Sequence, residues 1–142
     1  MRRSAWIGAA CAVAAAGLGG FWAGVATGQQ QQRTPPTDNQ GLGQEVLARI
    51  DLGDQLDGMA GYQLRLRRIT VAPGGHIGLH EHRGRPVVQY ILEGTLHDHR
   101  EGGVSHERPA GQGSAVEVST RHWEENRGST PVVLIAADVF KP

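Results

Sequence analysis

The sequence has a single cysteine among its 142 residues, and this residue, Cys11, lies close to the N-terminus. The remainder of the chain has no thiol, which excludes disulfide bonds and thiolate catalysis. An excess of charge is also lacking, because 14 Lys and Arg balance 14 Asp and Glu. We therefore expect no binding to nucleic acid and no electrostatic attraction to an anionic membrane surface.

The first 28 residues form a segment of their own. Arg2 and Arg3 precede a long run of Ala, Gly and larger apolar residues, which ends in small residues around Ala26 and Gly28. This pattern is typical of a secretory signal peptide, so we expect export to the periplasm or secretion. The alternative is an uncleaved anchor in the inner membrane, because residues 5–27 are long enough to span a bilayer. That anchor would be the chain's one contact with a membrane.

Helical periodicity is lacking in the rest of the chain. Residues 29–44 are rich in Gln and Pro and predict a flexible linker. Residues 45–142 consist of short apolar runs bounded by Gly, Pro and Asp, and no segment repeats its apolar residues every 3.6 positions over three turns. In "YQLRLRRITV" the leucines and arginines alternate, which predicts a strand with one face in solvent. These observations predict one all-β domain, a sandwich or barrel.

All seven histidines lie beyond residue 75. His80 and His82 are separated by one residue, and side chains two apart in a strand point to the same side. The pair can therefore approach one metal ion at the usual distance of about 2.0–2.1 Å, provided that a third ligand comes from elsewhere. His122 is the candidate for that ligand. Taken alone, a pair of this kind is equally consistent with two exposed histidines.

The surrounding residues resemble the two motifs of the cupin superfamily. The first motif, G(x)5HxH(x)3,4E(x)6G, is matched at Gly74, His80, His82 and Gly94. The second, G(x)5PxG(x)2H(x)3N, is matched at Gly111, His122 and Asn126, with Glu117 and Ser119 in place of its proline and middle glycine.

The resemblance is to small single-domain bacterial cupins, including the quercetin-dioxygenase type. It implies a double-stranded β-helix, or jelly roll, over residues 45–142. It also implies one divalent transition metal (Fe, Cu, Ni, Mn or Zn) bound by His80, His82 and His122. A homodimer is implied by the resemblance only.

One position departs from the family pattern. Counting back from Gly94 places Val87 where the motif has its glutamate ligand, and valine cannot bind a metal. Gln89 points to the same side of the strand, so its amide oxygen is a candidate replacement ligand. Without the glutamate, three neutral imidazoles leave a divalent ion's charge uncompensated. Such a site favours imidazole-binding ions and keeps coordination positions open.

Other polar residues have weaker support. Glu117 precedes His122 by five residues and is the candidate general base, although it is equally typical of a solvated turn. Of Glu124 and Glu125, one is predicted to face solvent and neither is given a role in the site, and His97 and His99 are predicted to lie on the surface. Arg83 and Arg85 follow the histidine pair in a loop and either bind an anionic substrate or only keep the loop soluble.

The motif does not determine the reaction, because this fold carries many activities. The first hypothesis is an exported oxidoreductase, similar to a dioxygenase, that acts on a small molecule at the three-histidine metal site. The alternative is a module that binds a metal or a small ligand without turnover. A weaker third possibility is a structural barrel with an empty site.

Overall fold

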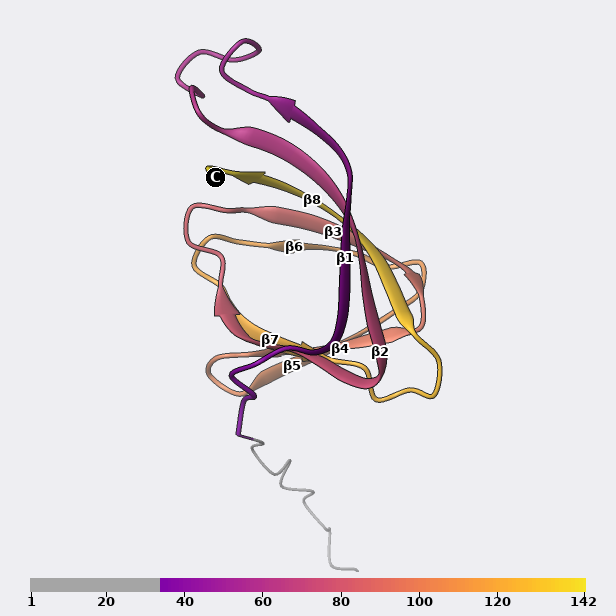
Figure 1. Cartoon of the computed structure of the whole chain (residues 1–142). Coiled ribbons are helices and arrows are strands. Elements are labelled where there is room, and N and C mark those ends of the chain that lie inside the picture. Colours follow the sequence, from indigo (N-terminus) through magenta and orange to yellow (C-terminus); the bar gives the residue numbers. More distant parts are fainter. Residues whose placement is uncertain (1–33) are drawn as a thin grey trace, which may run out of the picture. The chain divides into compact units, whose positions relative to one another are not determined.

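The computed structural model describes residues 34–142, and the predicted leader, the cysteine and residues 29–33 of the predicted linker lie outside this range (Figure 1). The described part contains eight strands: β1 (Gln40–Asp51), β2 (Gln63–Glu81), β3 (Val87–Glu93), β4 (Thr95–Arg100), β5 (Val104–Pro109), β6 (Gly113–Val116), β7 (Arg121–Glu125) and β8 (Val132–Phe140). No helix in this range has the length and apolar character that a membrane span requires.

All pairings between these strands are antiparallel, and they link the strands in the order β5-β4-β7-β2-β8-β3-β6. Strand β1 lies outside this order and pairs with β2. The long strand β2 joins two groups of strands. Its first half pairs with β1 and β8, and its second half pairs with β7. Figure 1 shows the sheet curling so that β3, β6 and β8 face β4, β5 and β7. The predicted all-β jelly-roll fold is confirmed.

The hydrophobic core lies inside the curled sheet. It contains the β-branched and leucine residues that alternate inward along β2, β3 and β8, such as Val71, Ile91 and Leu134. Strand β2 alternates regularly in its first half, but its leucines and arginines take unexpected faces. Leu64 is 41% exposed, whereas Arg67 is only 8% exposed and points inward. The wet face predicted for this strand therefore carries Leu64 and Leu66, and Arg65 and Arg67 lie on the more buried face.

The boundary between linker and domain lies earlier than the sequence predicts. Strand β1 begins at Gln40, so residues 40–44, which are predicted as linker, form a strand that pairs with β2. The segment before it also packs on β2. The Leu79 amide donates a hydrogen bond of 2.7 Å to the Pro36 carbonyl, and the Gly78 amide donates one of 2.9 Å to Asn39 Oδ1. Backbone pairing and the packing of Leu42 against the core decide this boundary.

Candidate metal centre

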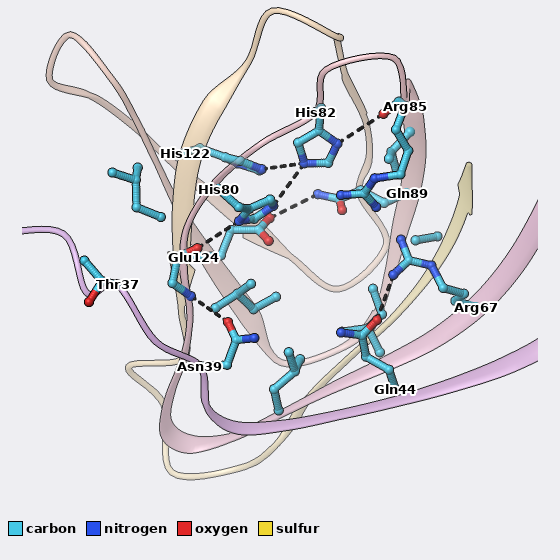
Figure 2. A pocket seen from close by; sticks show the side chains of 17 residues that line it. Thr37, Asn39, Gln44, Arg67, His80, His82, Arg85, Gln89, His122 and Glu124 are labelled. Carbon is cyan, nitrogen blue, oxygen red and sulfur yellow. Dashed lines mark hydrogen bonds between the residues drawn. The ribbon is translucent and has the colours of Figure 1, made fainter. Parts of the chain in front are cut away.

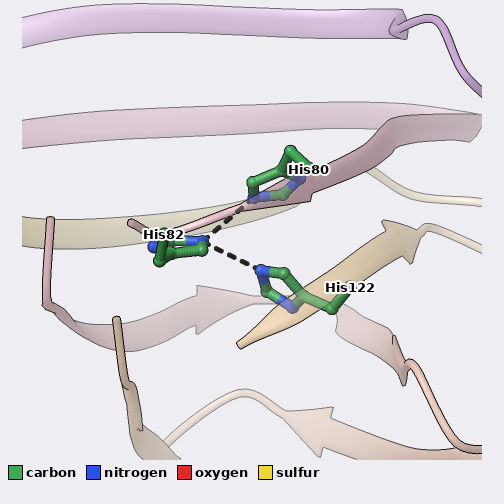
Figure 3. Close-up of side chains that lie close together, drawn as sticks. All are labelled: His80, His82 and His122. Atoms are coloured by element: carbon green, nitrogen blue, oxygen red, sulfur yellow. Dashed lines mark hydrogen bonds between the residues drawn. The ribbon is translucent and has the colours of Figure 1, made fainter. Parts of the chain in front are cut away.

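The three predicted ligands meet at one point (Figure 3). His80 lies near the end of β2, His82 follows directly after it, and His122 lies on β7. The register pairs His80 with His122, which brings together residues that are forty positions apart in the chain. His82 Nε2 lies 3.0 Å from Nε2 of His80 and 3.0 Å from Nε2 of His122.

An oxygen acceptor fixes the tautomer of each ring. The Nδ1 atoms of His80, His82 and His122 lie 2.9 Å from the Gly78 carbonyl, 3.3 Å from the Arg85 carbonyl and 2.7 Å from Asp98 Oδ1 respectively. An oxygen of this kind can only accept, so each Nδ1 donates and carries the proton of its neutral ring. All three Nε2 atoms then present lone pairs to one another. The lone pair of His82 repels those of His80 and His122 at 3.0 Å, and a cation between the three nitrogens removes this repulsion.

Burial favours the neutral form of His80 and His82. Removal from water and the nearby positive charge of Arg85 lower the pKa of His82 to about 4. Burial also lowers the pKa of His80. The lone pairs of these two rings therefore stay available to a metal.

The spacing of the nitrogens fits a single ion. Two nitrogens that are 3.0 Å apart both lie about 2.1 Å from an ion that they bind at an angle of about 90°. The chain thus offers three converging imidazole ligands, and the residues present fit the divalent transition metal that the sequence predicts. The ion's identity is not fixed by these distances.

A second layer of polar residues holds His122. Asp98 on β4 is completely buried and accepts the His122 Nδ1 proton. The same carboxylate accepts hydrogen bonds from Arg108 at 3.0 Å and Arg100 at 3.3 Å. Burial alone would raise the pKa of Asp98, but the hydrogen bond from His122 and the two guanidinium groups hold it below its usual range. The charged carboxylate therefore fixes the orientation of His122.

The histidines line one end of a cavity of about 330 Å³ (Figure 2). One part of its wall is apolar and comes from Leu42, Ile69, Ile77, Val87 and Ala136. Val87 is 4% exposed, so the position at which a glutamate is expected is filled by a buried apolar side chain. Thr37 and Asn39, from the segment before β1, line the cavity as well.

Glu124 and Gln89 form a polar contact inside this cavity. Glu124 lies two residues after His122 on β7, and its Oε1 is 3.5 Å from Gln89 Nε2. Complete burial raises the pKa of Glu124. Neither Glu124 nor Glu125 is predicted to have a role in the site, whereas Glu124 is buried and lines the cavity. Side chains two apart in a strand point to the same side, and Glu124 is two residues after His122. This spacing was sufficient to predict Glu124 in the site.

Glu117 does not reach the site. Its side chain is exposed, it does not line the cavity, and its carbonyl accepts the Thr120 amide in the turn that precedes β7. The predicted role of Glu117 as a general base at the metal is therefore wrong, because this turn separates it from the ligand strand.

Two further polar residues, His99 and Asn126, have defined contacts. His99 is half-buried rather than on the surface. It stacks on Trp123 with 4.1 Å between the ring centroids and pairs with Glu125 at 3.0 Å. Asn126, a residue of the second motif, fixes the turn after β7 by donating to the carbonyls of Val71 and Thr130.

Comparison with known families agrees with this geometry. Residues 67–138, half of the chain, match the cupin domain family. The chain is a cupin. The matched region contains every ligand candidate and also Arg67 and Arg85, which line the cavity. No curated protein matches this cupin in sequence.

Three solved structures show the extent of the similarity. An oxalate oxidase in complex with glycolate has 18% identity over 70% of this chain and 54% of its own, with a TM-score of 0.53. A cupin-2 domain protein from Rhodospirillum rubrum has 18% identity over 72% of this chain and 62% of its own, with a TM-score of 0.56. The polyketide cyclase RemF from Streptomyces resistomycificus has 18% identity over 75% of this chain and 70% of its own, with a TM-score of 0.58.

Sequence identities this low show only that the fold is shared. The cupin spans about half the length of the oxalate oxidase it matches. Membership of the superfamily is thus shown, whereas the narrower resemblance to quercetin dioxygenases stays a prediction.

Proposed function

We propose that this cupin binds one divalent transition-metal ion through His80, His82 and His122 and uses it to oxidise a small molecule. The observation that carries the proposal is the set of three Nδ1 protons, each held by an oxygen acceptor. These contacts aim three Nε2 lone pairs at one point, and no contact among the described residues supplies a proton there.

The cavity supports catalysis rather than storage. The three histidines leave further coordination positions open toward a space of about 330 Å³, which is at the small end of ligand pockets. A bound iron, copper, nickel or manganese ion supplies electron transfer and Lewis-acid chemistry at such a position. Burial raises the pKa of Glu124 and so favours its protonated form beside the site, and Gln89 Nε2 donates a hydrogen bond to its carboxyl group. Glu124 thus replaces Glu117 as the candidate acid or base.

A module that binds metal or ligand without turnover is the second candidate. The apolar Val87 favours it, because a site without the fourth ligand is not the complete set of the family pattern. In that case zinc would serve as well as a redox-active ion.

Metal analysis tests the proposal first. The full chain, purified from its native periplasm, is expected to carry close to one redox-active metal ion per chain. His122→Ala is expected to lose the ion, whereas His106→Ala, which changes an exposed histidine that does not line the cavity, is expected to keep it. A wild-type protein that takes up no transition metal, even when supplied in excess, would contradict the proposal.

Oxygen consumption then separates the two candidates. We expect the metal-loaded protein to consume oxygen with at least one member of a panel of flavonols, diketones and small organic acids. Glu124→Gln is expected to retain the metal but to lower the rate at least about 100-fold, the usual effect of losing a general acid or base. A fully loaded protein that consumes no oxygen with any of them supports the binding module.

We also propose that the protein acts outside the cytoplasm. This rests on the apolar N-terminal segment of the sequence alone. Fractionation of the native cells, with detection of the mature N-terminus by mass spectrometry, tests export and cleavage together.

A further inference from the structure

Three arginines surround one buried carboxylate at the cavity wall. Asp138 on β8 accepts two hydrogen bonds from Arg65, at 3.1 and 2.9 Å, and Oδ2 also accepts from Arg67 at 2.9 Å and from Arg85 at 3.1 Å. Burial alone would raise the pKa of Asp138, but these guanidinium groups hold it below its usual range. The cluster therefore contains three positive charges and one negative charge.

Two of these arginines reach the cavity. Arg67 and Arg85 both line it, and Figure 2 shows them on the same side of the cavity, with Arg85 next to His82. Arg67 is only 8% exposed. Its Nη1 donates to Gln44 and its Nη2 to Asp138, whereas its buried Nε has no acceptor among the described residues. A buried donor without a partner is rare in native proteins and indicates that a ligand supplies the acceptor.

The charge of the cavity favours an anion. Among residues 34–142, Glu124 is the only acidic residue that lines it. Even when Glu124 is ionised, the arginines and Asp138 leave the wall positive, and a divalent metal would add two further charges. An anionic ligand compensates this charge in a setting where water screens it poorly.

We infer that the cavity binds a small organic carboxylate, whose carboxyl group is held by Arg67 and Arg85. The planar fork of a guanidinium matches a carboxylate, and the apolar part of the wall, from Ile69, Ile77 and Leu42, contacts a carbon skeleton rather than a bare inorganic anion. This inference names the substrate class of the proposed site and so rests on the proposed function, but the arginine contacts themselves require no metal.

Calorimetric titration with benzoate, benzamide and inorganic phosphate tests the inference. Benzoate and benzamide have nearly the same shape and differ in charge. Each probe is titrated at constant ionic strength into the metal-free and the metal-loaded protein. We expect benzoate to bind at least tenfold more tightly than benzamide and phosphate to both forms of the protein.

Three variants locate the interaction. Arg67→Gln and Arg85→Gln are each expected to abolish the preference for benzoate while the metal content stays that of the wild type. Arg83→Gln is the matched control, because Arg83 belongs to the same loop as Arg85 but its side chain is 86% exposed and does not line the cavity. If Arg67→Gln does not fold, Arg85→Gln decides, since Arg85 lies in the loop after β2 and its side chain is 27% exposed.

The outcomes separate this inference from the proposed function. Equal binding of benzoate and benzamide to a protein that holds its metal would overturn the carboxylate site and leave the metal site standing. Phosphate binding as tight as benzoate would also overturn it. A protein that binds benzoate through Arg67 but takes up no metal would support the carboxylate site and contradict the proposed function.

Discussion

At the scale of single residues, Val87 and Glu124 define what is unusual about this metal centre. Val87 occupies the position of the family's glutamate and leaves an apolar wall beside the histidines. Glu124 brings a carboxyl group into the cavity from β7, but it groups with His122 and Asp98 rather than with the three histidines. The carboxyl group of the site therefore lies beside the metal ligands rather than among them.

Restoring the missing ligand is the first test at this scale. Val87→Glu is expected to raise the affinity for Mn²⁺ at least about tenfold, because a carboxylate adds a hard oxygen ligand and compensates the charge of the ion. Val88→Glu is the matched control, since Val88 is 60% exposed and points away from the cavity. Chelator competition measures both. Equal Mn²⁺ affinities in the two variants would show that position 87 does not reach the ion.

Asp98 provides a second test. Asp98→Asn is expected to weaken metal binding by about 10- to 100-fold, the usual effect of removing a carboxylate behind a histidine ligand. The measurement is competition against a chelator, with unfolding of the metal-free variant as a check on its fold. Asp57→Asn, at an exposed position, is the control. An unchanged metal affinity in a folded Asp98→Asn protein would contradict the role given to this carboxylate.

The histidines also predict a pH dependence. His82 has a pKa of about 4 in the folded protein, below the ordinary value of 6.5, so the unfolded chain binds more protons between these values. The stability of the metal-free protein is thus expected to fall as the pH falls from about 6.5 to about 4, by about 2 kcal/mol. Urea unfolding at a series of pH values measures it. His82→Asn is expected to flatten this decline, and an equally steep decline in that variant would contradict the assignment.

At the scale of the elements, β2 organises the site. Its first half carries Arg67 toward Asp138 on β8, and its end carries His80 opposite His122 on β7. The segment before β1 packs against this end at Gly78 and Leu79. One strand therefore connects the arginine wall, the metal ligands and the N-terminal part of the cavity wall.

Gly78 tests this packing. A methyl group there would meet the backbone of Asp38, so Gly78→Ala is expected to displace the segment that contains Thr37 and Asn39. We expect a loss of about 1–3 kcal/mol, as for other overpacked sites, and faster hydrogen exchange at the Leu79 amide. Gly43→Ala on β1 is the control, because its added methyl group would make only ordinary contacts at 3.9 Å. Unchanged exchange at Leu79 would contradict the predicted displacement.

At the scale of the whole molecule, folding and metal binding are linked. The three ligands come from β2, the residue directly after it and β7, and Asp98 behind them comes from β4, so the site exists only when these strands are paired. A ligand that binds only the folded state stabilises it by mass action. The described domain is then most stable when the metal is bound.

A thermal unfolding experiment measures this linkage. At a metal concentration of 100 times Kd the stabilisation is about 2.7 kcal/mol. We expect Tm to rise by about 10 °C in a domain of this size. His106→Ala is expected to show the same shift and His122→Ala none. A shift that persists in His122→Ala would place the bound metal elsewhere.

The sequence by itself determined the all-β fold and the triad, because strand alternation is local and the cupin spacings of His80, His82 and His122 can be read directly. Alternation also predicted Gln89 in the cavity, and applied to β7 it would have identified Glu124. Glu117 was wrongly predicted as a base at the metal, because its spacing from His122 in the sequence does not reveal the turn that lies between them.

Only the tertiary structure decided which partners face one another. The register between strands places Asp98 behind His122 and Asp138 among three arginines. It also turns Arg65 and Arg67 toward Asp138, while the leucines that alternate with them are exposed. It also showed that residues 36–39 close part of the cavity. These features depend on pairing between distant strands, and pairing is set by the packing of the whole sheet rather than by any short stretch of residues.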